Sequence, residues 1–159
     1  IGAERATCWG QCFTEHAATA DEEILVVPLI ESVKGAENID RLLQVEGVDT
    51  YFFGPADFSA SAGYRGQWEG PGVTEQILEL KDIINAAGKH CGVMSTSVQN
   101  LTERRDQGFR MLALGPDSGL LMRSMHQSLQ AVDCDRLPAT SLDPTDGKPV
   151  SKSDTKIKK

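Results

Sequence analysis

The sequence lacks a hydrophobic run of the length that crosses a membrane. Its longest apolar run, residues 24–30, is far short of the ~20 residues that a transmembrane helix needs. It also lacks an excess of basic residues, since 16 Lys and Arg stand against 23 Asp and Glu and give a net charge of −7. Binding nucleic-acid phosphates requires clustered Lys and Arg. We therefore expect a soluble chain whose partners include neither a bilayer nor a nucleic acid.

The 4 cysteines are too few and too widely spaced for a disulfide framework, and no Cys-x-x-Cys zinc motif occurs. They are typical of reduced thiols in the cytoplasm, where we expect the protein to be located. Cys8, Cys12 and His16 follow at intervals of four residues, which would place them on one helix face. A metal site is the weaker interpretation of this triad, because small apolar thiols pack readily in cores. The sequence begins with Ile1, and no charged-then-apolar stretch precedes the globular pattern, so we expect either that the N-terminus was removed or that the sequence starts within a gene.

Several catalytic fingerprints are also missing. No G-x-G-x-x-G, Walker A loop or H-E-x-x-H motif occurs, so neither a dinucleotide-binding Rossmann unit nor a P-loop enzyme is indicated. The composition, 40% hydrophobic and 25% charged, is nevertheless that of an ordinary globular protein. With 159 residues the chain has room for one domain or part of one.

A regular alternation of short apolar runs and helical segments is present. The runs 24–30, 49–54, 89–94 and 109–115 are too short for helices and do not alternate, which predicts strands buried on both faces. Segments with helical spacing cover 36–45, 73–87, 98–107 and 120–132. Gly47, Gly88 and Gly108 fall just past helix ends, where a positive φ caps a C-terminus. The order predicts an α/β protein with parallel strands, either doubly wound or half of a (β/α)₈ barrel, since a whole barrel needs ~250 residues.

The end of the chain differs in composition. Residues 138–159 are rich in Pro, Ser, Asp and Lys and almost free of apolar residues. This predicts a disordered polar and basic tail after a folded part at 1–137. A contact of the basic end with an anionic partner is a weaker alternative.

Two carboxylates follow predicted strands directly. Glu31 ends the first run, and Asp57 comes shortly after the Gly-Pro that breaks the second. Neighbouring parallel strands lie ~5 Å apart, so the two side chains can converge on one divalent cation such as Mg²⁺ or Mn²⁺. The alternative is structural: Glu31 pairs with a base such as Lys34, and Asp57 caps the helical turn at 58–62.

The segments "PLIESVKGAENIDRLLQVEGVDTYFFGPADFSASAGYRG", "AGKHCGV" and "GFRMLALGPDSGLL" resemble the HpcH/HpaI aldolase family, the metal-dependent pyruvate aldolases related to the citrate lyase β subunit. The resemblance implies a (β/α)₈ TIM barrel of the pyruvate/phosphoenolpyruvate-aldolase type, of which this chain would cover about the last four βα units. It further implies that Glu31 and Asp57 bind Mg²⁺, Mn²⁺ or Co²⁺. The implied substrate-binding residues are Gly54, Pro55, Ala56, Asp57 and Met94.

The chemistry implied by the resemblance is the cleavage or formation of a 4-hydroxy-2-oxo acid, with pyruvate and an aldehyde as partners. A metal held by the keto oxygen and carboxylate of pyruvate would stabilise the enolate. The family's catalytic His and Arg come from the first half of the barrel, so no catalytic base is visible here, and His16, His90 and His126 do not match that base. Leu29 stands where these aldolases usually have Gln, so a citrate-lyase-β-like acyl-CoA lyase remains an alternative, as does a non-catalytic half-barrel interaction fragment.

Association between copies is a further implication of the resemblance. Family members commonly exchange their last helix between subunits, which implies a homo-oligomer built from dimers, possibly a hexamer. The segment 118–132 carries an apolar stripe that could serve this exchange. The stripe consists of Leu120, Leu121, Met125 and Leu129.

Overall fold

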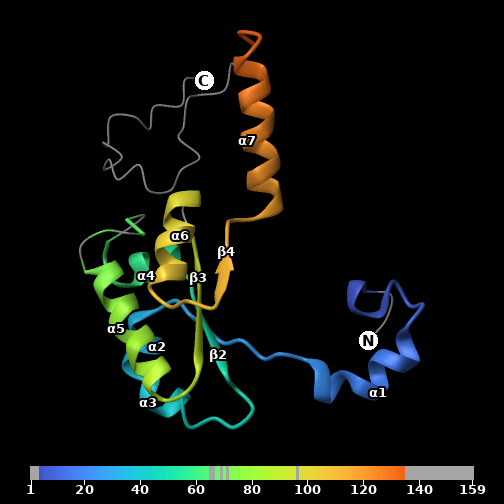
Figure 1. Cartoon of the computed structure of the whole chain (residues 1–159), viewed down its shortest axis with the longest axis vertical. Coiled ribbons are helices and arrows are strands. Elements are labelled where there is room, and N and C mark those ends of the chain that lie inside the picture. The colour runs from blue at the N-terminus through green and yellow to red at the C-terminus, as the bar shows by residue number, and fades with distance from the viewer. Residues whose placement is uncertain (1–3, 65–66, 69, 71, 96, 135–159) are drawn as a thin grey trace.

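A parallel sheet of four strands forms the centre of the protein (Figure 1). The computed structural model describes residues 4–64, 67–68, 70, 72–95 and 97–134. The strands follow chain order across the sheet and are β1 Leu29–Ile30, β2 Thr50–Phe53, β3 His90–Met94 and β4 Met111–Ala113. Each run predicted to be a strand therefore contributes one, and the predicted parallel pairing is confirmed.

Helices connect successive strands and also flank the sheet at both ends of the chain. The short 3₁₀ helix η1 (Arg5–Thr7) and α1 (Phe13–Glu23) precede β1. The remaining helices are α2 Val33–Glu37, α3 Ile39–Leu42, α4 Pro55–Ser61, α5 Val73–Ala86, α6 Val98–Asp106 and α7 Asp117–Gln130. Gly88 and Gly108 follow the C-caps of α5 and α6 with φ values of 76° and 96°, so the predicted left-handed positions after these helices are confirmed. Gly47 is also left-handed, with a φ of 75°, but it lies in a separate turn, because α3 already ends at Leu42.

Three predicted elements need correction. The run 24–30 supplies only two strand residues, because the pairing with β2 begins at the Pro28 carbonyl, which accepts from Phe52 N at 2.9 Å, and residues 24–26 are exposed. The helix predicted at 36–45 is two short helices, since Asn38 ends α2 and begins α3. The triad Cys8, Cys12 and His16 does not share a helix face, because α1 begins only at Phe13.

The hydrophobic core lies between the sheet and its helices. Tyr51 and Phe53 of β2 and Cys91 and Val93 of β3 are completely buried on the side that α5 covers. Helix α5 places Ile77, Leu80 and Ile84 against them. Burial of a side chain of this size contributes about 1.5–3 kcal/mol, so this layer holds the strand ends in place.

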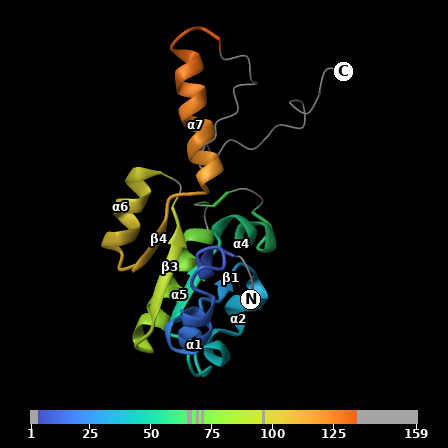
Figure 2. The same ribbon diagram turned by 90° about the vertical axis from the view of Figure 1, so that its right-hand side faces the viewer.

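The opposite face of the sheet is not covered in the same way. Leu29 of β1 is 51% exposed, and all three residues of β4 are partly exposed. The prediction of strands buried on both faces therefore fails for β1 and β4, because an open sheet of four strands leaves its outer strands less covered. It holds largely for β2 and β3, where Thr50 and Gly92 are buried on this face. In Figure 2 this face is turned toward the viewer, with α1 in front of it and α7 extending beyond the end of the sheet.

Two remaining expectations concern the C-terminal tail and the absence of a membrane-spanning segment. The predicted tail at 138–159 lies outside the described residues, so its disorder stays a prediction. In the part of the chain that the structure describes, no helix combines the length and apolar character required to span a bilayer.

Candidate functional site

The carboxyl ends of the strands bring the predicted site residues into one row. The register pairs Ile30 with Phe53 and Phe53 with Val93. The residue after each of these three therefore lies in one row across the sheet, and this row consists of Glu31, Gly54 and Met94. Met94 pairs in turn with Ala113. Paired residues of neighbouring strands point to the same face. Glu31 and Met94 thus share the uncovered face at the carboxyl edge.

Glu31 lies directly against Gly54. A Cβ atom built on Gly54 would be 3.3 Å from Glu31 Cβ and 3.6 Å from Glu31 Oε2. Only the absence of a side chain at position 54 leaves this space open to the carboxylate. The backbone is tied here as well, because Gly54 N donates to the Ile30 carbonyl at 3.2 Å.

Asp57 is placed by the first turn of α4. Gly54 is the N-cap, Pro55 is the first helical residue, and Asp57 follows two residues later with an exposed side chain. Proline suits this position because its missing N–H would be unpaired there anyway. The far end of α4 is fixed to the chain after β1, since Ser61 Oγ accepts from Val33 N at 3.1 Å. The two carboxylates therefore come from elements that are joined at both ends.

The structural alternative for this pair is wrong. The N-cap of α4 is Gly54 rather than Asp57, and no side-chain cap is formed there. Lys34 is not paired with Glu31: in the described chain neither Glu31 nor Asp57 makes an ion pair or a side-chain hydrogen bond. Two unpaired carboxylates at neighbouring strand ends suit a hard divalent cation, which prefers oxygen ligands. Within the described ranges no group of three His, Cys, Asp or Glu side chains has the arrangement of a metal site.

The three histidines lie away from this row. His90 begins β3 and is therefore at the amino end of the sheet, opposite Glu31. His16 is on α1 and His126 is on α7. None of the three is the residue that directly follows a described strand, and the absence of a catalytic base of the family type stays a prediction.

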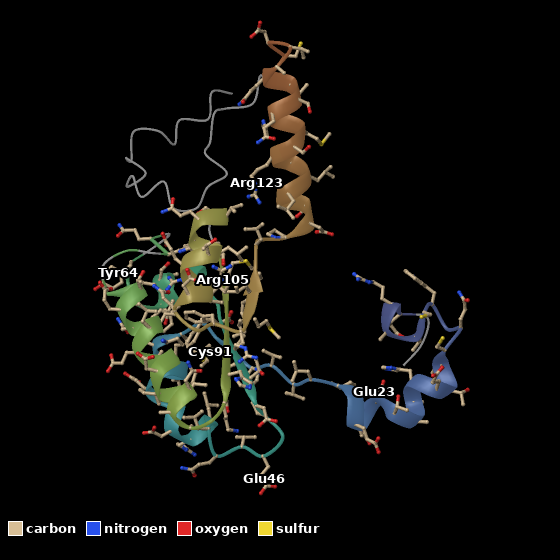
Figure 3. The ribbon with its side chains drawn as sticks, viewed as in Figure 1. Glu23, Glu46, Tyr64, Cys91, Arg105 and Arg123 are labelled. Carbon is tan, nitrogen blue, oxygen red and sulfur yellow. The ribbon has the colours of Figure 1, made fainter. Side chains whose placement is uncertain are left out.

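One positive charge near the carboxyl edge was not identified from the sequence. The Nη2 atom of Arg123 is 3.7 Å from the position of a Cβ on Gly115, which follows β4 and has a φ of 104°. In Figure 3 the Arg123 side chain leaves α7 and points back toward the end of the sheet. The sequence shows only that Arg123 lies about one turn into a helix that follows a predicted strand. It does not show that this arginine lies near the strand ends, because that depends on the direction in which α7 leaves the sheet.

Comparisons with known proteins agree on one family. A sequence model described as HpcH/HpaI aldolase/citrate lyase matches residues 3–124. The chain is 36% identical over 123 residues to a hydroxypyruvate/pyruvate aldolase of Pseudomonas aeruginosa, and the aligned region covers 77% of this chain and 46% of that protein. It is 34% identical over 124 residues to a 4-hydroxy-2-oxovalerate aldolase of Rhodococcus jostii, and the aligned region covers 77% of this chain and 47% of that protein.

A solved structure supports the same assignment. An HpcH/HpaI aldolase/citrate lyase family protein from Burkholderia cenocepacia matches with a TM-score of 0.69 and 28% identity, over 84% of this chain and 51% of that one. The chain spans about half the length of the curated relatives it matches. Its four-stranded parallel sheet is accordingly part of a (β/α)₈ barrel, which confirms the predicted fold class.

Proposed function

Because this chain belongs to the HpcH/HpaI aldolase/citrate lyase family, we propose that the protein is a metal-dependent carbon–carbon lyase. The proposed reaction cleaves a 4-hydroxy-2-oxo acid to pyruvate and an aldehyde, or joins the two in reverse. Relatives named as aldolases of hydroxypyruvate/pyruvate and of 4-hydroxy-2-oxovalerate support this substrate class. The observation that carries the proposal is the unpaired carboxylate of Glu31 beside Gly54, which is the N-cap of the helix that carries Asp57.

In this proposal Glu31 and Asp57 hold one divalent cation, Mg²⁺, Mn²⁺ or Co²⁺. When bound, such a cation supplies a Lewis acid that lowers the energy of a negatively charged keto oxygen. Gly54 leaves room for a substrate beside Glu31, and the first-turn amides of Ala56 and Asp57 face an anionic group of the substrate without a backbone partner within the helix. The role of Pro55 is to fix that turn, and Met94 borders the same space from β3.

A general base and an arginine are still required for turnover. General-base catalysis contributes roughly 10²–10⁴-fold, and no histidine of the described chain lies at the carboxyl edge. We therefore propose that this chain alone binds the cation but has almost no aldolase activity, so that metal binding can be measured without turnover. The protein is also proposed to act in the cytoplasm.

Leu29 favours a second candidate, a lyase that acts on an acyl-CoA compound as the citrate lyase β branch does. Leu29 lies two residues before Glu31, is half exposed, and its Cδ1 is 3.8 Å from the Cβ position of Gly54. An apolar side chain there borders the proposed substrate space and offers no hydrogen bond to a polar group. Calorimetry with pyruvate and with acetyl-CoA, which needs no turnover, separates the two candidates. A Leu29→Gln variant that gains affinity for pyruvate would support the aldolase, and a wild type that binds acetyl-CoA but not pyruvate would support the acyl-CoA lyase.

The experiment that tests the metal site is calorimetry of the full chain with Mn²⁺. Glu31→Gln and Asp57→Asn should each weaken binding by ~10-fold or more, at least about 1.4 kcal/mol, because each removes an anionic ligand of a hard cation. The matched control is Glu37→Gln, an exposed carboxylate on α2 that should change nothing. Wild-type affinity in both site variants, or equal loss in the control, would show that the pair does not bind the cation.

A further inference from the structure

The chain before α1 folds back on itself and brings two cysteines together. Cys8 and Trp9 have φ values of 49° and 56°, and Gly10 follows with 90°, so three successive residues are left-handed. Cys12 N donates to the Thr7 carbonyl at 2.9 Å, and Gln11 N donates to the Cys8 carbonyl at 3.3 Å. These bonds close a tight loop between positions 8 and 12.

Thr7 anchors this loop from the inside. It is 1% exposed, its Oγ1 donates to the Glu4 carbonyl at 2.9 Å, and the same oxygen accepts from Gly10 N at 3.1 Å. Left-handed non-glycine residues are unfavourable unless the surrounding structure holds them. Thr7 and the backbone bonds provide that support, so the loop is a defined element and not an extended end.

The backbone bonds of the loop place the two cysteines at its two ends, four residues apart in the chain. A side-chain hydrogen bond to Cys8 raises the pKa of the Cys12 thiol, and the charge of Cys8, burial and Glu15 act in the same direction. The raised pKa favours the protonated form of the Cys12 thiol. Cysteines at the two ends of a loop closed by these backbone bonds can form a disulfide with small backbone movement.

The pair is accessible, in contrast to the core cysteine. Cys8 is exposed and Trp9 beside it is 69% exposed, whereas Cys91 is fully buried. A Cβ on Gly10 would have no neighbour within 4 Å, so the outer side of the loop is open. A reagent of the size of a tripeptide can reach Cys8.

We propose that Cys8 and Cys12 form a reversible dithiol–disulfide site that is oxidised by low-molecular-weight disulfides. The Cys8 thiolate attacks one sulfur of the small disulfide, whose S–S bond breaks and releases one thiolate. Cys12 then gives up its proton and attacks the Cys8 sulfur, which releases the second small thiolate. The protein loses two electrons and two protons, and the small disulfide is reduced to two thiols. This site is separate from the proposed metal site and does not depend on it.

The test uses the full chain and oxidised glutathione as the probe. After incubation, alkylation and digestion with trypsin, the fragment 6–34 contains both cysteines and can be weighed. We expect it to lose two hydrogen atoms, to carry no alkyl group and no lasting glutathione, and to regain both thiols in reduced glutathione. In Cys12→Ser the glutathione adduct on Cys8 should persist at least about tenfold longer, because the intramolecular second step is lost.

The matched control is Cys134→Ser, which removes an exposed thiol outside the loop and should leave oxidation of the fragment unchanged. The proposal is overturned if wild-type fragment 6–34 accumulates glutathione adducts as Cys12→Ser does. It is equally overturned if both thiols stay fully alkylatable under conditions that convert Cys134 to its adduct.

Discussion

At residue scale, the candidate site depends on the small size of Gly54. Its φ of −100° is accessible to any residue, so the glycine is not required by the backbone. The requirement is spatial, since a side chain at this position would fill the space beside Glu31 Oε2. The same row continues with Met94, whose side chain is partly exposed on that face. Met94 therefore borders the proposed substrate space without contributing a charge.

Substitution of Met94 tests which part of the substrate it contacts. Met94→Ala should change the preference among acceptor aldehydes by several-fold and leave pyruvate affinity nearly unchanged, because a smaller side chain enlarges only the apolar side of the space. The measurement requires a protein with turnover and compares kcat/KM for a series of aldehydes. An unchanged acceptor profile would mean that Met94 serves only packing, for which Met is well suited.

Cys91 gives a pH dependence of stability. Burial raises the pKa of this thiol to about 12, with Asp82 acting in the same direction and Lys81 against it. Below pH 9 the thiol is protonated in both the folded and the unfolded chain. Between pH 9 and 12 only the unfolded chain ionises it, so this contribution to folding stability falls as pH rises. Urea unfolding should show a steeper loss of stability from pH 8 to pH 10.5 in the wild type than in Cys91→Val, and parallel curves would contradict the assignment.

At the scale of elements, the strands and their order could be predicted from the sequence. Short apolar runs separated by helical spacing allow few arrangements, because parallel strands joined by right-handed crossovers are usually neighbours. The placement of Glu31 and Asp57 at adjacent strand ends follows from that order alone. Their joint binding of a cation stays a prediction, since neither composition nor spacing fixes the rotamers of two exposed carboxylates.

Other elements could not be predicted, for identifiable reasons. Helix α1 buries none of its residues, so it has no apolar stripe for a periodicity argument to detect. The break between α2 and α3 depends on Asn38, whose Nδ2 donates to the Lys34 carbonyl at 2.7 Å and competes with a continuous helix. The contact of Arg123 with Gly115 depends on the direction in which α7 leaves the sheet, which no local pattern determines.

Replacing Gly92 by alanine tests how closely the central strands are packed. A Cβ at this position would lie 2.6 Å from Phe52 Cδ2 and 2.8 Å from both Cβ and the carbonyl oxygen of Met111. Because one of these contacts is backbone, Gly92→Ala should lower the free energy of unfolding by about 1–3 kcal/mol. Gly119→Ala is the control: this helical glycine has 3.4 Å to Pro116 Cγ, and alanine there should be neutral or stabilising by up to about 1 kcal/mol. Equal stability of the two variants would contradict the packing argument.

At the scale of the whole molecule, α7 extends beyond the end of the sheet (Figure 1). None of its residues is buried in the single chain. Met122 on α7 and Val132 just past its end extend the stripe expected from the sequence. The exposed set is Leu120, Leu121, Met122, Met125, Leu129 and Val132.

We predict that this helix mediates self-association. Light scattering of the full chain should give a mass above that of the 17.2 kDa monomer, and Leu121→Glu with Met125→Glu should reduce it, because charges in an apolar contact are costly. Ser124→Glu adds the same charge at an exposed position of α7 outside the apolar set and serves as the control. A monomeric wild type, or an equal effect of the control, would count against an interface at this helix.

The order of the strands also bears on how the molecule forms during synthesis. Each strand pairs with the one that precedes it in the chain, so the sheet can grow by one strand at a time as residues leave the ribosome. Only the short segment 31–49 separates β1 from β2, and closing a loop of that length carries a small entropic cost. Glu31 and Asp57 are thus both in place once α4 has emerged, before β3 adds Met94 to the same row. A cation that binds this pair could therefore act on a nascent chain and favour the first strand pairing over competing ones.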